Sequence, residues 1–204
     1  MNILIGMECS GIVRDAFIAA GHNAMSCDLL ETERPGPHYK GDIRDILESG
    51  GVSWDIAIYH PDCTYLCSSG LHWNKKRPGR ILQTEAALEM VRYLMKPRVH
   101  VRAYCVENPV GRIGTAIRKA DQYIQPYQFG HDASKRTGLW LYNLPLIVPN
   151  PADYVQPRMV DGKPRWANQT DSGQNALAPS DDRWMDRART YEGIAGAFAL
   201  NWGL

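Results

Sequence analysis

The sequence has no long apolar run and no excess of charge of one sign. No apolar stretch approaches the roughly 20 residues that a membrane-spanning helix needs, and the N-terminal residues show neither a basic leader nor a cleavage site. The 23 basic and 22 acidic residues leave a net charge of +1, so composition alone indicates no polyanionic partner. We therefore expect a cytoplasmic protein without a membrane partner; the sequence indicates no oligomeric state.

Cysteines are few and form neither a disulfide framework nor a metal site. They are Cys9, Cys27, Cys63, Cys67 and Cys105. An odd number without dense spacing favours reduced thiols. Cys63 and Cys67 are the only close pair, and no second Cys or His pair completes a zinc site, although His60 lies nearby. We expect no metal, and we expect Cys27 and Cys105, inside predicted strands, to be inert and buried.

Apolar strand-like stretches alternate with helical ones along the 204 residues. The expected strands are 2–5, 23–27, 54–59, 101–106 and 139–142, and the clearest helices are 12–20 and 82–94. Residues 68–76 show no regular period and are expected to be a loop. This order predicts an α/β fold with a doubly wound, mostly parallel sheet and helices on both faces. A hydrophobic content of 44% over this length suits one domain, residues 1–204.

Candidate binding residues fall where predicted strands end, which is where ligands bind in such sheets. The small-residue turn Gly6–Gly11 offers backbone N–H groups to a cofactor, but a turn of this kind also needs glycine simply for positive φ. Asp28 is a candidate partner for ribose hydroxyls, and Asp42 for an adenine amine. Each is equally well explained as a helix cap or turn residue.

Cys63 is the strongest candidate nucleophile, because it follows a short apolar strand within Pro61-Asp62-Cys63. The run Glu107-Asn108-Pro109 follows a second predicted strand and supplies a carboxylic acid. A thiol and a carboxyl group brought together at one sheet edge indicate covalent catalysis on a pyrimidine ring.

Several residue groups, taken in order, resemble the DNA cytosine-5 methyltransferases, in particular a short bacteriophage form. They are the turn Gly6–Gly11, Asp28, Gly41-Asp42-Ile43, Pro61-Asp62-Cys63, Glu107-Asn108-Pro109, Ser134-Lys135-Arg136 and the segment 191–197. The resemblance covers nearly the whole chain. It implies the fold of the S-adenosylmethionine-dependent methyltransferases, which is Rossmann-like.

The resemblance also implies a role for each matching residue. The cofactor S-adenosylmethionine would be bound by Gly6, Glu8, Ser10, Gly11, Asp28, Asp42 and Pro61. Catalysis would fall to Cys63, Glu107 and Arg136, and substrate binding to Asn108, Lys135 and Tyr65. The Cys63 thiolate would add to C6 of cytosine, and a raised pKa would let Glu107 donate a proton at N3. Lys135 or Arg136 would bind O2 or a phosphate and keep the thiolate charged.

The chain departs from the family at three places. Asp62 replaces a proline before the cysteine, Gly196 stands where an asparagine is expected, and the segment 143–189 is too short for a target recognition domain. We treat this segment as a reduced insert. With little surface to compensate for base flipping, DNA that is single-stranded or has its target base flipped out becomes the attractive substrate. The stacking platforms would be Tyr65, Trp73 and Trp166, for each of which ordinary packing is the alternative.

Two other functions stay open. The near-neutral charge and the missing recognition domain also suit C5 modification of a free pyrimidine nucleotide. The departures at Asp62 and Gly196 leave room for a catalytically silent relative that binds nucleic acid or cofactor.

Overall fold

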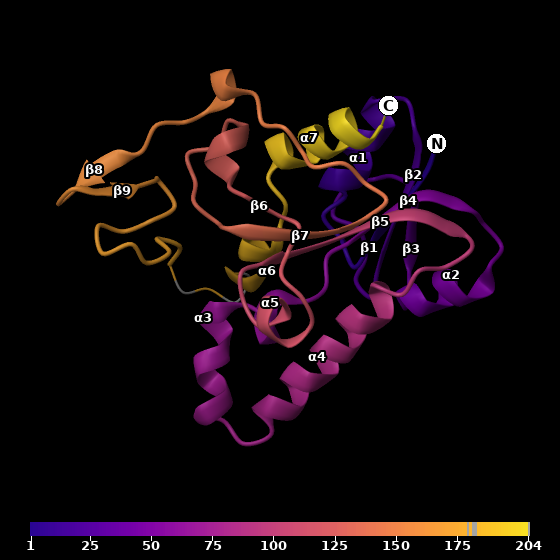
Figure 1. Ribbon diagram of the computed structural model, residues 1–204, viewed down its shortest axis with the longest axis horizontal. Coiled ribbons are helices and arrows are strands. Elements are labelled where there is room, and N and C mark those ends of the chain that lie inside the picture. Colours follow the sequence, from indigo (N-terminus) through magenta and orange to yellow (C-terminus); the bar gives the residue numbers. More distant parts are fainter. Residues whose placement is uncertain (179, 181–182, 204) are drawn as a thin grey trace.

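A seven-stranded sheet forms the centre of the computed structural model, which describes residues 1–178, 180 and 183–203 (Figure 1). The strands lie in the order β3-β2-β1-β4-β5-β7-β6. Their bounds are β1 Asn2–Gly6, β2 Asn23–Asp28, β3 His38–Lys40, β4 Trp54–Tyr59, β5 Val101–Pro109, β6 Gln122–Ile124 and β7 Thr137–Tyr142. The first five strands pair in parallel, whereas β7 runs antiparallel to both β5 and β6.

Helices cover both faces of this sheet. Figure 1 shows α1 (Ile12–Ala19) and α7 (Glu192–Trp202) on one side, and α2 (Ile43–Ser49) and α4 (Arg80–Leu94) on the other. Because successive strand residues point to opposite faces, β1 serves both layers. Ile3 and Ile5 pack under α1 and α7, whereas Leu4 packs under α2 and α4, and all three are fully buried. The predicted α/β fold with a mostly parallel sheet is confirmed, and it is compatible with a Rossmann-like fold.

The segment 68–76, predicted to be a loop, instead contains α3 (Ser68–Leu71) and the 3₁₀ helix η2 (His72–Lys75). That prediction was wrong because these turns depend on tertiary contacts rather than on a periodic apolar stripe. A side chain at Gly70 would overlap the backbone carbonyl of Thr64, in the 3₁₀ helix η1 (Cys63–Tyr65). Glycine therefore lets α3 lie directly against the Cys63 turn.

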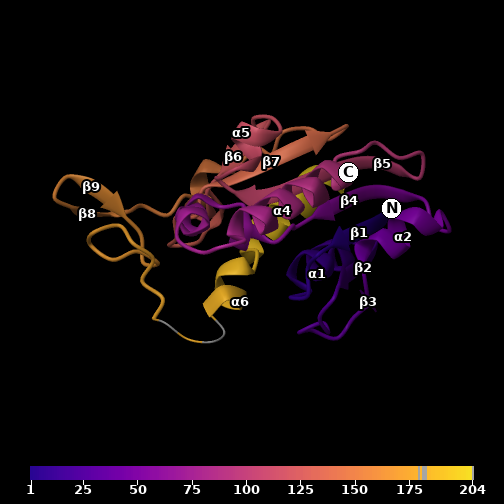
Figure 2. The same cartoon turned by 90° about the horizontal axis from the view of Figure 1, so that it is seen from below.

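The region after β7 extends away from the sheet. It contains η4 (Pro151–Asp153) and the two-stranded hairpin of β8 (Arg158–Val160) and β9 (Lys163–Arg165), which lies at the periphery in both views (Figures 1 and 2). The chain then returns to the sheet through α6 (Arg183–Ala188). Between β5 and β7 lie α5 (Ile113–Ala116) and η3 (Pro126–Phe129).

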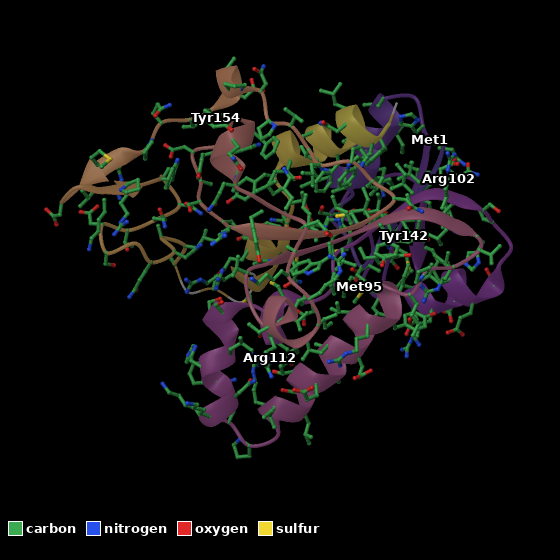
Figure 3. The ribbon with its side chains drawn as sticks, viewed as in Figure 1. Met1, Met95, Arg102, Arg112, Tyr142 and Tyr154 are labelled. Carbon is green, nitrogen blue, oxygen red and sulfur yellow. The ribbon has the colours of Figure 1, made fainter. Side chains whose placement is uncertain are left out.

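Tyr104 links the sheet to the end of α4. Its ring stacks on Tyr142 at a centroid distance of 5.2 Å, and its hydroxyl donates to the carbonyl of Met95; both partners are labelled in Figure 3. Cys27 and Cys105 are fully buried, as predicted. No helix in the described part of the chain combines the length and the apolar character needed to cross a membrane.

Candidate functional site

A cavity of about 460 Å³ lies at the carboxyl ends of β1, β2, β4 and β5. Most of the predicted site residues line it: Glu8, Ser10, Asp28, Asp42, Pro61, Cys63, Glu107, Asn108 and Lys135. Gly6, Gly11, Tyr65 and Arg136 do not line it. The fold therefore brings together residues that lie up to 127 positions apart in the sequence, from Glu8 to Lys135.

The turn after β1 is organised by a buried carboxylate. Glu8 accepts a hydrogen bond from the Ile12 N–H at 3.1 Å and one from the Ser10 hydroxyl, so it caps the start of α1. Its second oxygen, Oε2, is buried and has no hydrogen-bond partner among the residues that the structure describes. Gly11 has φ 74°, and a side chain at Gly6 would meet Ile43 and Tyr59, so both glycines serve backbone shape and packing.

The two acids expected to bind a nucleoside are partly engaged with the protein. Asp28 Oδ1 accepts from the Leu30 N–H at 3.0 Å. Asp42 caps α2 by accepting from the Arg44 N–H at 2.9 Å, and its hydrogen bonds with the Arg44 guanidinium lower the pKa of the carboxyl group. The cap interpretation is thus confirmed for Asp42. Since both residues also line the cavity, a binding role for them stays a prediction.

Glu107 lies opposite His60, which follows β4. His60 Nδ1 is 3.1 Å from Glu107 Oε2, and the two side chains are only 10% and 11% exposed. Burial raises the pKa of Glu107, but the hydrogen bond and charge of His60, the charge of Lys135 and a hydrogen bond from Thr137 together lower it below its ordinary value. The predicted raised pKa was therefore wrong, because the sequence did not reveal these partners. His60 Nε2 is buried without a partner.

Asn108 ties the end of β5 to the loop that carries Cys63. Its side-chain N–H donates to the Pro61 carbonyl at 2.7 Å, and the residue is almost fully buried. Asp62 accepts from the Thr64 N–H at 2.8 Å and so begins η1. These two contacts fix the loop from both sides, which makes Asn108 a positioning residue as much as a substrate-binding candidate.

The surroundings of Cys63 act on the pKa of its thiol in both directions. A hydrogen bond with Cys67 and burial raise its pKa, and the nearby charge of Lys135 only partly offsets this. The charge of Lys135 acts in the predicted direction, because it lowers the pKa of Cys63; that Lys135 or Arg136 keeps the thiolate charged stays a prediction. The interaction with Cys63 lowers the pKa of the Cys67 thiol to about 5, and Ser69, the Gly70 N–H and the charge of Arg187 lower it as well.

A second, larger hollow of about 770 Å³ opens on the other side of Cys63. Among the residues that the structure describes, its charged lining side chains are mostly basic: Arg77, Arg80, Lys135, Arg136 and Arg187, together with Asp186. We call this hollow the basic groove. Cys63, Thr64, Pro109 and Lys135 line both the cavity and the basic groove, so they form the wall between the two.

Of the three aromatic residues predicted to stack on bases, only Trp73 has surroundings that agree with that role. Trp73 lines the basic groove with 36% of its surface exposed, beneath the Arg77 guanidinium at 4.3 Å. Trp166 instead stacks on Tyr127 at 4.4 Å, and Arg80 covers the ring of Tyr65, so ordinary packing explains both.

The cations of the Ser134-Lys135-Arg136 run point to different places. Arg136 lies over the ring of Tyr123 and reaches only the basic groove. Lys135 faces both hollows, and its ammonium group donates to the Arg187 carbonyl at 2.9 Å.

The sequence alone indicated no catalytic part for His60 or for Cys67. The available signals were that His60 immediately follows β4 and that Cys67 lies one helical turn after Cys63. Within the described residues, no three His, Cys, Asp or Glu side chains cluster in a way that would bind a metal ion. The chain matches no known protein-family profile, and no curated protein sequence matches it significantly.

Proposed function

We propose that this protein transfers a methyl group from S-adenosylmethionine to C5 of cytosine in DNA, through a covalent bond between Cys63 and C6. The observation that carries the proposal is the position of Cys63 in the wall between an acid-lined cavity and a basic groove. Methyl transfer needs a nucleophile at the point where a nucleoside cofactor and a polyanionic substrate meet. The α/β fold and the resemblance to the cytosine-5 methyltransferases agree with this proposal. The proposal itself depends on the residues of the site, because one fold can carry many functions.

The cavity suits the proposed cofactor in size and in chemistry. Its volume of about 460 Å³ is in the range of pockets that enclose small cofactors. The orphaned Glu8 Oε2 is a ready acceptor for an ammonium group, and Asp28 is placed to accept from ribose hydroxyls. The cofactor would supply a methyl group activated by a sulfonium.

Cys63 would add to C6 and make C5 nucleophilic enough to accept the methyl group. As the carbon–sulfur bond forms, the Cys63 proton would pass to the sulfur of Cys67, which lies one helical turn away. Loss of the C5 proton and expulsion of the thiolate then restore the aromatic ring. Cys67 would thus be the acceptor of the Cys63 proton.

Glu107 would bind N3 and the exocyclic amine of the base. His60 stabilises the charged form of the Glu107 carboxyl group. The proton that N3 needs as electrons move from C6 toward N3 would therefore come from the hydrogen bond that His60 and Glu107 share. Lys135, between the two hollows, would bind O2 or a phosphate.

The basic groove favours a polynucleotide over a free nucleotide. Its described lining combines several cationic side chains with Trp73, and such a lining suits a phosphate backbone with stacked bases. Flipping a base out of duplex DNA costs a few kcal/mol, so single-stranded DNA is the preferred form in this proposal.

The test is transfer of tritiated methyl groups from S-adenosylmethionine to single-stranded DNA, duplex DNA and dCMP. We expect label in DNA, most of it in single strands, and none with Cys63→Ser. Cys105→Ala, at a fully buried thiol that lines neither hollow, is the matched control and retains transfer. Label in dCMP alone supports the free-nucleotide function. Binding of S-adenosylmethionine without any transfer supports a silent relative.

A further inference from the structure

Cys63 and Cys67 form a thiol pair with one helical turn between them. The Cys67 N–H donates to the Cys63 carbonyl at 2.9 Å, so the backbone closes a turn. Such a turn places Cα atoms four residues apart at about 6 Å, inside the span of about 4.4–6.8 Å that disulfides usually bridge. Both thiols line the basic groove.

The environment of Cys67 is that of a reactive thiol. It is half-exposed, its Sγ lies 3.1 Å from the Ser69 hydroxyl, and Arg187 in turn donates to that hydroxyl at 3.4 Å. Hydrogen bonds and a nearby cation favour the thiolate, which is the form that reacts with peroxides. Cys63, one turn away, is in place to act as the resolving thiol.

We propose that Cys63 and Cys67 form a peroxide-sensitive modification site, which closes to a disulfide and removes the nucleophile from the cavity. The Cys67 thiolate attacks one oxygen of hydrogen peroxide, giving a sulfenic acid and hydroxide. The Cys63 sulfur then attacks the Cys67 sulfur and forms the S–S bond. The Cys63 proton and the sulfenic hydroxyl leave as water. Two thiols are oxidised by two electrons, and one peroxide is reduced to two waters.

The bond would be reversible. A disulfide that is half-exposed and closes a short turn is the kind that dithiols reduce readily. Formation of the bond does not depend on the proposed function, whereas loss of methyl transfer rests on it. Since Cys63 has no free thiol in the oxidised state, addition to C6 would stop until a dithiol restores it.

Peptide mapping of the full-length chain tests the site directly. The reduced protein is treated with stoichiometric hydrogen peroxide, alkylated with iodoacetamide and digested with trypsin. Both thiols fall on one tryptic peptide, residues 45–75. We expect this peptide to be two hydrogens lighter and its alkylation to fall at least about tenfold, with both changes reversed by dithiothreitol.

Cys9 provides an internal control in the same sample. It is also half-exposed, but burial and the nearby charges of Asp28, Glu33 and Glu8 raise its pKa to about 11. It should stay alkylatable under conditions that close the pair.

Two variants separate the steps. With Cys63→Ser, Cys67 should accumulate as a sulfenic acid that a cyclic dione traps. With Cys67→Ser, Cys63 should remain open to alkylation after the same treatment. The proposal is overturned if the wild-type pair stays alkylated, or if it passes to sulfinic and sulfonic acids without a link. Absence of methyl transfer from the reduced protein counts against the proposed function alone, because the mass readout does not require turnover.

Discussion

Arg14 is a fully buried cation, and its replacement by methionine should strongly destabilise the protein. Its guanidinium donates to the hydroxyls of Ser26 and Thr32, both at 3.1 Å, and to the carbonyls of Arg34 and Pro35 at 3.0 and 3.2 Å. A hydrogen bond to a charged group contributes about 1.5–3 kcal/mol. The guanidinium also donates to the partly exposed Asp15 carboxylate at 2.8 Å. If this carboxylate and the two loop carbonyls regain water in the variant, the two bonds to Ser26 and Thr32 predict a loss of about 3–6 kcal/mol.

That loss is a large part of the 5–15 kcal/mol by which domains of this size are usually stable. Urea unfolding followed by circular dichroism measures it directly. Methionine keeps the unbranched stem, so the change isolates the guanidinium. Arg102→Met, at an exposed position on β5 labelled in Figure 3, is the control and should stay within about 0.5 kcal/mol of wild type. A loss below about 1 kcal/mol for Arg14→Met would refute the reasoning.

Three further changes test the site and its support. Because the folded pKa of Glu107 is below its ordinary value of 4.5, the charged carboxylate should stabilise the fold fully above that pH, and this stabilisation should be lost as pH falls through the folded pKa. The variant His60→Asn removes the charge that lowers this pKa and keeps the burial that raises it, so it should abolish or reverse the trend in urea unfolding. An unchanged trend would count against the pairing of His60 with Glu107. Gly193→Ala should lower the free energy of unfolding by about 1–3 kcal/mol, because its methyl group would overlap the Phe129 carbonyl. Gly196→Ala, which points into open space on the same helix α7, should raise the free energy of unfolding by up to about 1 kcal/mol. Equal effects of the two changes in urea unfolding would contradict the packing of α7. Asn108→Asp should replace an attraction with a repulsion and speed hydrogen exchange in the loop after β4, and unchanged exchange would show that the bond does not hold this loop.

Much of the fold could be predicted from apolar periodicity. The strands 2–5, 23–27 and 54–59 were expected where β1, β2 and β4 occur, and the helix expected at 82–94 is α4, Arg80–Leu94. These elements have strong local patterns because each buries one face or both. The turn 68–75 has no such pattern, since its helices exist through contact with the Cys63 loop, and no local signal revealed them.

Sequence alone predicted those site residues that lie at or just after the end of a parallel strand. Asp28, Cys63 and Glu107 all reach the cavity by this rule. Side-chain pairing across the site was not predictable, because it depends on the register between β4 and β5. For this reason the pKa of Glu107 was predicted in the wrong direction: burial was foreseen and His60 was not.

The central claim is that Cys63 forms a covalent bond to C6 of cytosine, and trapping with 5-fluorocytosine DNA tests it most directly. Fluorine at C5 blocks the last elimination, so the adduct should persist when S-adenosylmethionine is supplied. We predict a protein–DNA complex stable to denaturant, with the attachment mapped to Cys63 and lost in Cys63→Ser. A complex that survives Cys63→Ser, or one attached through Cys67, would contradict the account.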